Sequence, residues 1–393
     1  MPGGDLQLNK LGAQDLYLYG NPQMTYFKSV YRRHTNFAME TIRFDFEGTR
    51  ELANNVNTHF RCKIPRNGDL LNKLYFVINL PDIYSGYDND INYDFQWIPN
   101  IGTQMIIRCS LLIGGVMISE LYGQWIEIWH EMFLDTAGKN NFDEMVGNVP
   151  DVFIPANNGW NAGKYPTSTL QPELNVDPIS TNWYTSKFKA NPYLQPPSIE
   201  KRKLYVPLPF WFCTNPGLSL PLIALQYHDV HLEFEMRPII QLYTIIETRS
   251  NIGSFRTVPL QSNTYHHIGN FITGVPDISF KNDQNLTDGS TNIQGWDMDS
   301  HILGNYIFLD EDERKQFASN SHEYLIEQVY RKEFTGVTGT QLLDLDFSHP
   351  VKYLVWFGQR DDISSLINAH NNYTNWSRPV SASMGFTVEP GGY

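Results

Sequence analysis

The sequence predicts an all-β protein. Short runs in which apolar and polar residues alternate recur along the 393 residues, and 28 glycines and 23 prolines separate them. Aromatic residues make up 14% of the chain and charged residues 18%, against a typical charged share of about 25%. Frequent aromatic and turn residues favour β-strands, and this composition argues against a coiled coil, a helical bundle or a disordered chain.

Most of the expected strands lie in the first half of the chain. Residues 1–27 are expected to form an N-terminal arm, because glycines and the Gly20-Asn21-Pro22 turn interrupt any regular element. Alternating residues predict half-buried strands, and continuous apolar runs predict more deeply buried ones. On these grounds strands are expected over residues 42–46, 60–64, 74–80, 105–113, 203–212 and 230–236.

One substantial helix is expected in this half. Ser119 suits its N-cap, and Gly138 lies just beyond its expected C-terminus. Apolar residues recur between them at helical spacing and share one face. That face consists of Leu121, Trp125, Ile128, Trp129 and Met132.

Residues 147–200 are expected to form a long excursion without regular elements, because prolines and glycines interrupt them repeatedly. A structureless excursion of this length inside a compact domain is usually functional or forms an interface. Trp160 and Trp183 lie within it, and tryptophan is enriched at interface hot spots. We therefore consider both residues as interface anchors, with ordinary loop packing as an equal alternative.

A domain boundary is expected near Arg237-Pro238, which divides the chain into units at 28–237 and 238–393. Further strands are expected in the second unit, over residues 239–248, 324–330, 343–347 and 351–357. Many short strands and few helices indicate sandwiches or jelly rolls. From these patterns alone a sandwich, a jelly roll and a propeller blade all remain open.

The net charge of −13 comes from 42 acidic and 29 basic residues, and a surface of this sign repels phosphate. No sequence-specific nucleic-acid binding is therefore expected. The three cysteines are too few and too widely spaced for a disulfide framework or a zinc site. We also expect no secretory signal and no membrane helix.

Lys28, Arg32 and Arg33 form a local basic cluster with interleaved aromatic residues. This cluster could contact an anionic partner, or it could be a packed segment whose cations pair with acidic neighbours. The acidic net charge of the whole chain favours the packed segment.

No motif commits the chain to catalysis, a cofactor or a metal. The carboxylate pairs Asp344/Asp346 and Glu233/Glu235 each share a strand face, so a glycosidase is conceivable, but a solvent-facing polar row is the simpler interpretation. The histidine pairs 228/231 and 266/267 are spaced so that a strand would turn the two rings of each pair to opposite faces.

Three sequences match the N-glycosylation acceptor pattern, which chance also explains. Their asparagines are Asn285, Asn372 and Asn375.

Several longer segments resemble the major capsid proteins of large nucleocytoplasmic DNA viruses, the group that includes the chlorella-virus, iridovirus, marseillevirus and mimivirus proteins. The segments follow the family's order over most of the chain, and the opening one is long and irregular. They are residues 12–15 (GAQD), 20–23 (GNPQ), 25–38 (TYFKSVYRRHTNFA), 207–212 (PLPFWF), 220–228 (LPLIALQYH), 324–329 (YLIEQV) and 349–356 (HPVKYLVW).

The resemblance implies a double jelly roll, two eight-stranded antiparallel sandwiches in one chain. It further implies a structural virion protein without catalytic activity, whose homotrimers form pseudo-hexagonal capsomers of an icosahedral shell assembled in the host cytoplasm. The N-terminal arm would lie on the inner face of the shell. There Lys28, Arg32 and Arg33 would meet minor capsid proteins or an internal membrane, and the capsomers would also contact penton proteins.

One departure from the family concerns the C-terminus. In the family a long further stretch follows the HPVKYLVW segment, whereas here the chain reaches Tyr393 soon after it. We therefore expect the second jelly roll to lack its last strands, either because the chain is incomplete or because another chain supplies them. The alternatives to a major capsid protein are a paralogous minor capsid protein of the same fold and a jelly-roll carbohydrate-binding module that stacks sugars on Trp376.

Overall fold

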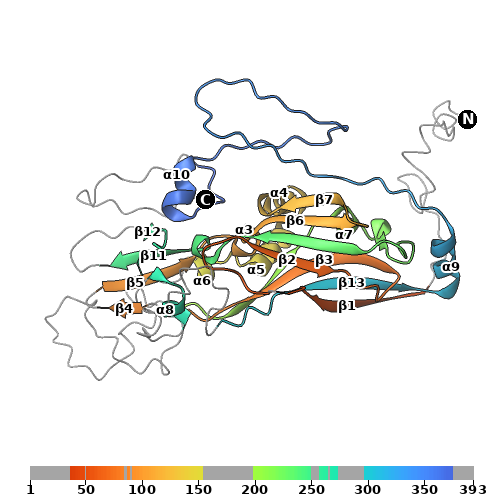
Figure 1. The fold of residues 1–393 in the computed structure, drawn as a ribbon, viewed down its shortest axis with the longest axis horizontal. Helices are drawn as coiled ribbons and strands as arrows, with labels where there is room; N and C mark the ends of the chain where they lie inside the picture. Colours follow the sequence, from red (N-terminus) through yellow and green to blue (C-terminus); the bar gives the residue numbers. More distant parts are fainter. Residues whose placement is uncertain are drawn as a thin grey trace, which may run out of the picture.

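The computed structural model describes most of the chain and confirms the all-β class. Its strands form three antiparallel sheets (Figure 1). The expected strands up to residue 248 are found as β1, β2, β3, β6, β8, β10 and β11, although 208–212 leaves β8 and leads into a short helix. The described residues are 36–48, 50–83, 86–88, 91–153, 198–248, 256–263, 266–272 and 296–374.

The first sheet is built around a strand that the sequence pattern did not predict. Its order is β1 (Phe37–Asp45), β13 (His301–Leu309), β3 (Leu70–Leu80) and β8 (Arg202–Pro207), and β9 (Leu220–Pro221) also pairs with β3. β13 therefore crosses from beyond residue 237 into a sheet formed otherwise by the first half of the chain. The division near residue 237 remains a proposal, and β13 would be its exception.

The second sheet packs face to face on the first. Its order is β2 (Thr58–Lys63), β10 (Val230–Met236), β6 (Ile106–Ile113) and β7 (Val116–Tyr122). Along β10 buried and half-buried residues alternate strictly, because one face of the strand points into the core and the other toward solvent.

Aromatic rings join these two sheets. Phe234 of β10 lies 5.5 Å from Phe76 of β3 between ring centroids, and Phe46 lies 4.9 Å from Phe60 and 5.6 Å from Phe234. All four side chains are at most 3% exposed. Burial of a ring of this size stabilises the fold by about 1.5–3 kcal/mol, so this cluster is a large part of the core of the sandwich.

The third sheet has the order β12 (Arg256–Thr257), β11 (Tyr243–Thr248), β5 (Ile91–Trp97) and β4 (Gly86–Asp88). Figure 1 shows it at the opposite end of the molecule from α9. Phe95 stacks on Tyr243 with ring centroids 4.8 Å apart, and the Phe271 ring packs against Phe95 with a centroid distance of 5.2 Å.

Short helices cover the ends and connections of the sheets. They are α3 (Ile101–Gln104), α4 (Gly123–Phe133), α5 (Thr136–Val146), α6 (Pro150–Phe153), α7 (Trp211–Thr214), α8 (Gly269–Ile272), α9 (Glu311–Ser319) and α10 (Asp361–Ile367), with 3₁₀ turns η4 (Pro216–Leu218) and η5 (Ile239–Gln241).

The expected helix is real, but both of its predicted ends are wrong. α4 begins at Gly123 and not after Ser119, because Ser119 belongs to β7, where it pairs with Leu111 of β6. α4 ends at Phe133, and Gly138 lies inside α5, whose N-cap Asp135 accepts a hydrogen bond from the Gly138 amide at 2.8 Å.

We predict that Gly123→Ala destabilises the protein strongly. A Cβ at this first residue of α4 would overlap the carbonyl oxygens of Thr103 and Ile106, which are backbone atoms and cannot turn aside. We expect a loss of about 3 kcal/mol in the free energy of unfolding, at the upper end of typical overpacking costs. Urea unfolding measures it. Gly358→Ala is the matched control, because no atom lies within 4 Å of a Cβ there, and an equal loss in both variants would contradict the explanation.

Candidate assembly surface

The most exposed apolar surface in the described part of the chain is the segment 321–359, which we call the extended arm. It joins α9 to α10, and Figure 1 shows it in blue, passing the side of the body that carries β7 and α4. The strands expected over residues 324–330, 343–347 and 351–357 all fall within it. That prediction is wrong for this structure, in which all three segments are irregular.

The start of the arm lies against the body without joining a sheet. Ile326 and Val329 pack on the hydrophobic core. The Gln328 side-chain amide donates to the Ile118 carbonyl at 2.6 Å, and the Tyr324 hydroxyl donates to the Ser219 carbonyl at 3.3 Å. These side-chain contacts hold the segment beside β7. Among the described strands, β7 is an edge strand that pairs only with β6, and the arm reaches it through a side chain without the main-chain pairing that a β-ladder needs.

Along its whole length the arm also exposes large apolar side chains to solvent. Leu342 is 94% exposed, Leu325 88% and Trp356 87%. Isolated exposed apolar residues are ordinary, but a segment this rich in them marks an interaction site. Ion pairs hold the arm to itself: Lys332 lies 3.3 Å from Asp346, and Lys352 contacts Glu327.

Both ends of the arm are fixed to the body. At α9, the half-exposed Arg314 side chain donates two hydrogen bonds of 3.0 Å to the two carboxylate oxygens of the buried Asp69. At α10, the Asn368 amide donates to the carbonyls of Ile240 at 3.0 Å and Tyr243 at 2.8 Å. The arm is therefore presented at a defined place, which suits a surface that must meet a partner in one orientation.

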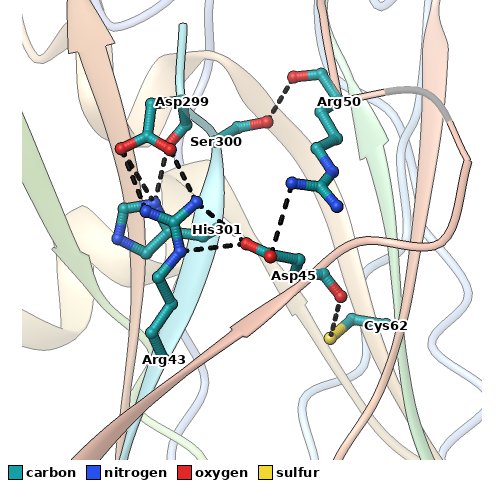
Figure 2. Close-up of polar contacts among 7 residues, drawn as sticks. All are labelled: Arg43, Asp45, Arg50, Cys62, Asp299, Ser300 and His301. Atoms are coloured by element: carbon teal, nitrogen blue, oxygen red, sulfur yellow. Dashed lines mark hydrogen bonds and ion pairs between the residues drawn. The ribbon is translucent and has the colours of Figure 1, made fainter.

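A polar cluster ties β13 to the corner between β1 and β2 (Figure 2). Arg43 of β1 forms a bidentate pair with Asp299, at 2.6 and 3.1 Å, just before β13 begins. Asp45 lies 3.4 Å from Arg50 and accepts from the Cys62 thiol of β2 through its carbonyl at 3.4 Å. Ser300 donates to the Arg50 carbonyl. The cluster thus joins four chain segments, and its Arg43–Asp299 pair spans 256 residues.

The surroundings in this cluster favour the charged form of the Asp299 carboxylate and the neutral form of the His301 imidazole. The hydrogen bonds from Arg43 are the main cause that lowers the pKa of Asp299. Burial lowers the pKa of His301, which donates from Nδ1 to the Asp299 carbonyl at 2.6 Å. The arrangement is a structural clamp, since every group in it is already engaged with another.

Glu127 of α4 is a second titratable group that the sequence did not reveal. Its Oε1 accepts from the Thr103 hydroxyl and from the Gln104 side-chain amide at 2.6 Å. Burial is the main cause that raises its pKa to about 7, while these hydrogen bonds act in the opposite direction. No local pattern marks it, because its partners come from α3, more than 20 residues earlier.

Most of the site residues expected from the sequence lie outside the described residues. These are Lys28, Arg32, Arg33, Trp160, Trp183, Asn285, Asn375 and Trp376. Asn372 is described and half-buried. Its side-chain oxygen accepts from the Thr374 amide at 2.9 Å and from the Thr374 hydroxyl at 2.7 Å, so the residue is held in a local turn.

The carboxylate pairs considered for catalysis do not form a site. On β10, Glu233 lies 3.6 Å from Arg61 and Glu235 lies 3.4 Å from Arg108, as expected for a solvent-facing row of alternating charge. Asp344 and Asp346 sit on the exposed arm beside Lys332.

The described ranges contain no group of three or more His, Cys, Asp or Glu side chains that could hold a metal ion. Nor does any helix within those ranges have the length and apolar character needed to cross a membrane.

Two family models match the chain in succession. The model described as "Major capsid protein N-terminus" matches residues 25–310, and the model described as "Large eukaryotic DNA virus major capsid protein" matches residues 313–385. The first match ends directly after β13, and the second contains α9, the extended arm and α10.

Individual proteins show the same similarity. The chain is 34% identical over 400 residues to the major capsid protein of Phaeocystis pouchetii virus, an alignment that covers 99% of this chain and 66% of that protein. It is 34% identical over 361 residues to capsid protein 1 of Acanthamoeba polyphaga mimivirus, covering 91% of this chain and 48% of that protein. The chain therefore spans about half to two thirds of the length of these curated relatives.

Among solved structures, the chain resembles PBCV-1 VP54, as fitted into a cryo-EM reconstruction of the virophage Sputnik. The TM-score is 0.44 and the sequence identity 24%, and the match covers 77% of this chain and 50% of that one.

We predict that Asp299→Asn destabilises the protein by about 1 kcal/mol at pH 7. Hydrogen bonds to charged groups contribute about 1.5–3 kcal/mol, and the 41% exposure of Arg43 reduces this value. Because the folded-state pKa of Asp299 is lowered, its contribution is present above the ordinary value of about 3.9 and is lost as the pH falls through the folded-state value.

Urea unfolding at pH 7 and pH 3 tests this prediction. The difference between Asp299→Asn and the unaltered chain should shrink at pH 3. Glu40→Gln, at an exposed position of β1 away from any helix end, should show no such dependence. A difference that stays constant between the two pH values would exclude the ion pair as its source.

We also predict that Glu127→Gln removes a pH dependence. Since the folded-state pKa is raised, stability falls as the pH rises from about 4 to 7, where the buried carboxyl ionises, and then levels off. The glutamine still accepts from Thr103 and Gln104 but carries no charge. At pH 8 the variant should be more stable by about 1 kcal/mol, and at pH 4 it should equal the unaltered chain.

Thermal unfolding across this pH range gives the comparison. Glu131→Gln on the same helix is the control, because Glu131 is exposed and paired with Lys139 at 2.6 Å. Parallel curves for Glu127→Gln and the unaltered chain would show that Glu127 does not titrate near pH 7.

Proposed function

This chain belongs to the major capsid proteins of large eukaryotic DNA viruses, and we propose that it is a structural subunit of an icosahedral virion shell. The observation that carries the proposal is the succession of the two family matches, which together take in residues 25–385 with almost no gap. Identity of 34% to a viral major capsid protein over 99% of the chain supports it.

The proposed mechanism is assembly without catalysis. Three copies would form a pseudo-hexagonal capsomer of double jelly rolls, and weaker polar contacts between capsomers would let the lattice correct its errors. Permanent interfaces resemble a protein core cut in half, so they bury large apolar side chains. The extended arm offers such side chains, which supports a role for it between copies of this chain.

Other contacts follow from the same proposal. Lys28, Arg32 and Arg33 would face the shell interior, toward minor capsid proteins or an internal membrane. Trp160 and Trp183 would anchor contacts between subunits. Penton proteins would be further partners, Asn285, Asn372 and Asn375 would be glycosylation positions, and assembly would take place in the host cytoplasm.

Self-association of the purified chain tests the proposal. Light scattering should give a mass of three chains of 45.4 kDa each, and electron micrographs should show pseudo-hexagonal particles. A monomer at micromolar concentration would contradict a self-sufficient capsomer. Copy number in virions would then separate a major from a minor capsid protein.

Substitutions in the arm test its part in association. We predict that Leu342→Asp combined with Trp356→Asp weakens self-association by about 100-fold or more, since burying two such side chains contributes about 3 kcal/mol or more. Tyr227→Asp is the matched control, because Tyr227 is 93% exposed but lies outside the arm. Sedimentation as a function of concentration measures both. Equal weakening by the control would show that added charge, and not the arm, is responsible.

A further inference from the structure

A polar pocket lies where the chain leaving β10 meets β12 and α10. Its volume is about 430 Å³. Its polar lining comes from two segments that are distant in sequence, residues 237–241 and 364–370, and the apolar residues Ile240, Val258 and Pro259 complete the wall. The polar lining residues are Arg237, Gln241, Ser364, Ser365, Asn368 and His370.

Arg237 stands in this pocket without a carboxylate. Its Nε donates to the Gln104 carbonyl at 2.9 Å, and its Nη1 lies 3.4 Å from the side-chain oxygen of Gln241. Both acceptors are neutral, and Nη2 has no partner among the described residues. Nine other arginines in the described ranges have a carboxylate within 4.0 Å, such as Arg43 and Arg314. Arg237 is therefore an exception to the way this protein pairs its guanidinium groups.

The surroundings of Arg237 leave its charge uncompensated. Burial, and to a lesser degree the positive charge of Arg331, lower the pKa of Arg237 to about 10, so the group remains a cation at neutral pH. Burial and the charge of Arg237 lower the pKa of His370 to about 3, so its ring is neutral there. The nearby carboxylates of Asp361 and Asp362 do not line the pocket, and Asp362 is paired with Arg360 at 2.7 Å.

Further hydrogen-bond groups surround the cation. The Ser364 and Ser365 hydroxyls bond only to carbonyls of their own helix, so each can turn toward a ligand. The amide of Asn368 and the Nε2 of His370 are occupied by main-chain carbonyls of residues 240–243, which fixes the wall of the pocket. A half-buried cation beside two hydroxyls that can turn toward a ligand favours a negatively charged acceptor, because burying an unpaired charge is costly.

We propose that this pocket binds an oxyanion, a carboxylate or a phosphate group, on the guanidinium of Arg237, with the hydroxyls of Ser364 and Ser365 as additional donors. A water molecule occupies about 30 Å³ of liquid, so the pocket holds far more than one small ion. It therefore admits either a hydrated free anion or an acidic side chain together with the peptide that carries it. This proposal does not depend on the role of the chain in a virion.

Thermal unfolding of the full chain tests the proposal. Sodium phosphate is compared with sodium chloride at equal ionic strength and pH 7, and acetyl-tetraglutamate amide is compared with acetyl-tetraglutamine amide. We expect at least one oxyanion probe to raise the Tm saturably, by about 3 °C. Arg237→Met should abolish this rise, and Arg360→Met, which removes a paired arginine beside the same helix, should keep it.

A second variant keeps the test decisive if Arg237→Met does not fold. Ser365→Asp places a carboxylate in the pocket, so it should raise the Tm in chloride and cancel the response to both probes. A response to phosphate identifies a free oxyanion as ligand, and a response to the acidic peptide alone identifies an acidic segment. The proposal fails if neither probe exceeds its control, or if the unaltered chain and the variants respond equally.

Discussion

The insertion of β13 between β1 and β3 is the interaction on which the rest of the structure depends. It pairs His301 with both Asp45 and Val77, so residues more than 200 positions apart in sequence meet in one sheet. Closing so long a loop costs conformational entropy before any contact compensates for it. Two clamps offset this cost: Arg43 binds Asp299 before β13, and Arg314 binds Asp69 after it. Without β13 the first sheet would lose its centre, and the face that receives the second sheet would be lost with it.

The position of the extended arm depends on β13. The arm begins after α9, which Arg314 fixes to the end of the sandwich, and it ends at α10, which Asn368 fixes to the chain between β10 and β11. α10 also supplies two serines of the pocket that contains Arg237. The candidate assembly surface and the candidate oxyanion pocket are thus both held by side-chain hydrogen bonds from α9 and α10 to the body of the protein. The extended arm itself belongs to no sheet.

Local patterns predicted strands whose own alternation marks a buried and a solvent-facing side, and missed features that depend on distant contacts. The alternation of β10 predicted its two faces correctly, including the solvent-facing Glu233. β13 was not predicted, and its Gly304 shows why. A Cβ there would lie 2.8 Å from the Phe44 ring, so this glycine is required by packing against β1 and not by a local turn. The raised pKa of Glu127 and the lack of a carboxylate partner for Arg237 likewise depend on neighbours that no sequence window contains. Composition excluded classes of protein, whereas only the resemblance pointed to a capsid.

The extended arm shows that strand propensity and strand formation are separate properties. Residues 351–357 are β-branched and aromatic enough to favour a strand, yet they remain irregular, because a strand needs a neighbour to satisfy its main-chain groups. Each large apolar side chain left in water there forgoes about 1.5–3 kcal/mol of burial, while surface ion pairs such as Lys332–Asp346 contribute at most about 1 kcal/mol. The net charge of −13 keeps separate copies apart at long range. Apolar burial is short-ranged and acts only on contact, so side chains such as Leu342 and Trp356, which bury little surface in one copy, would gain that burial on association.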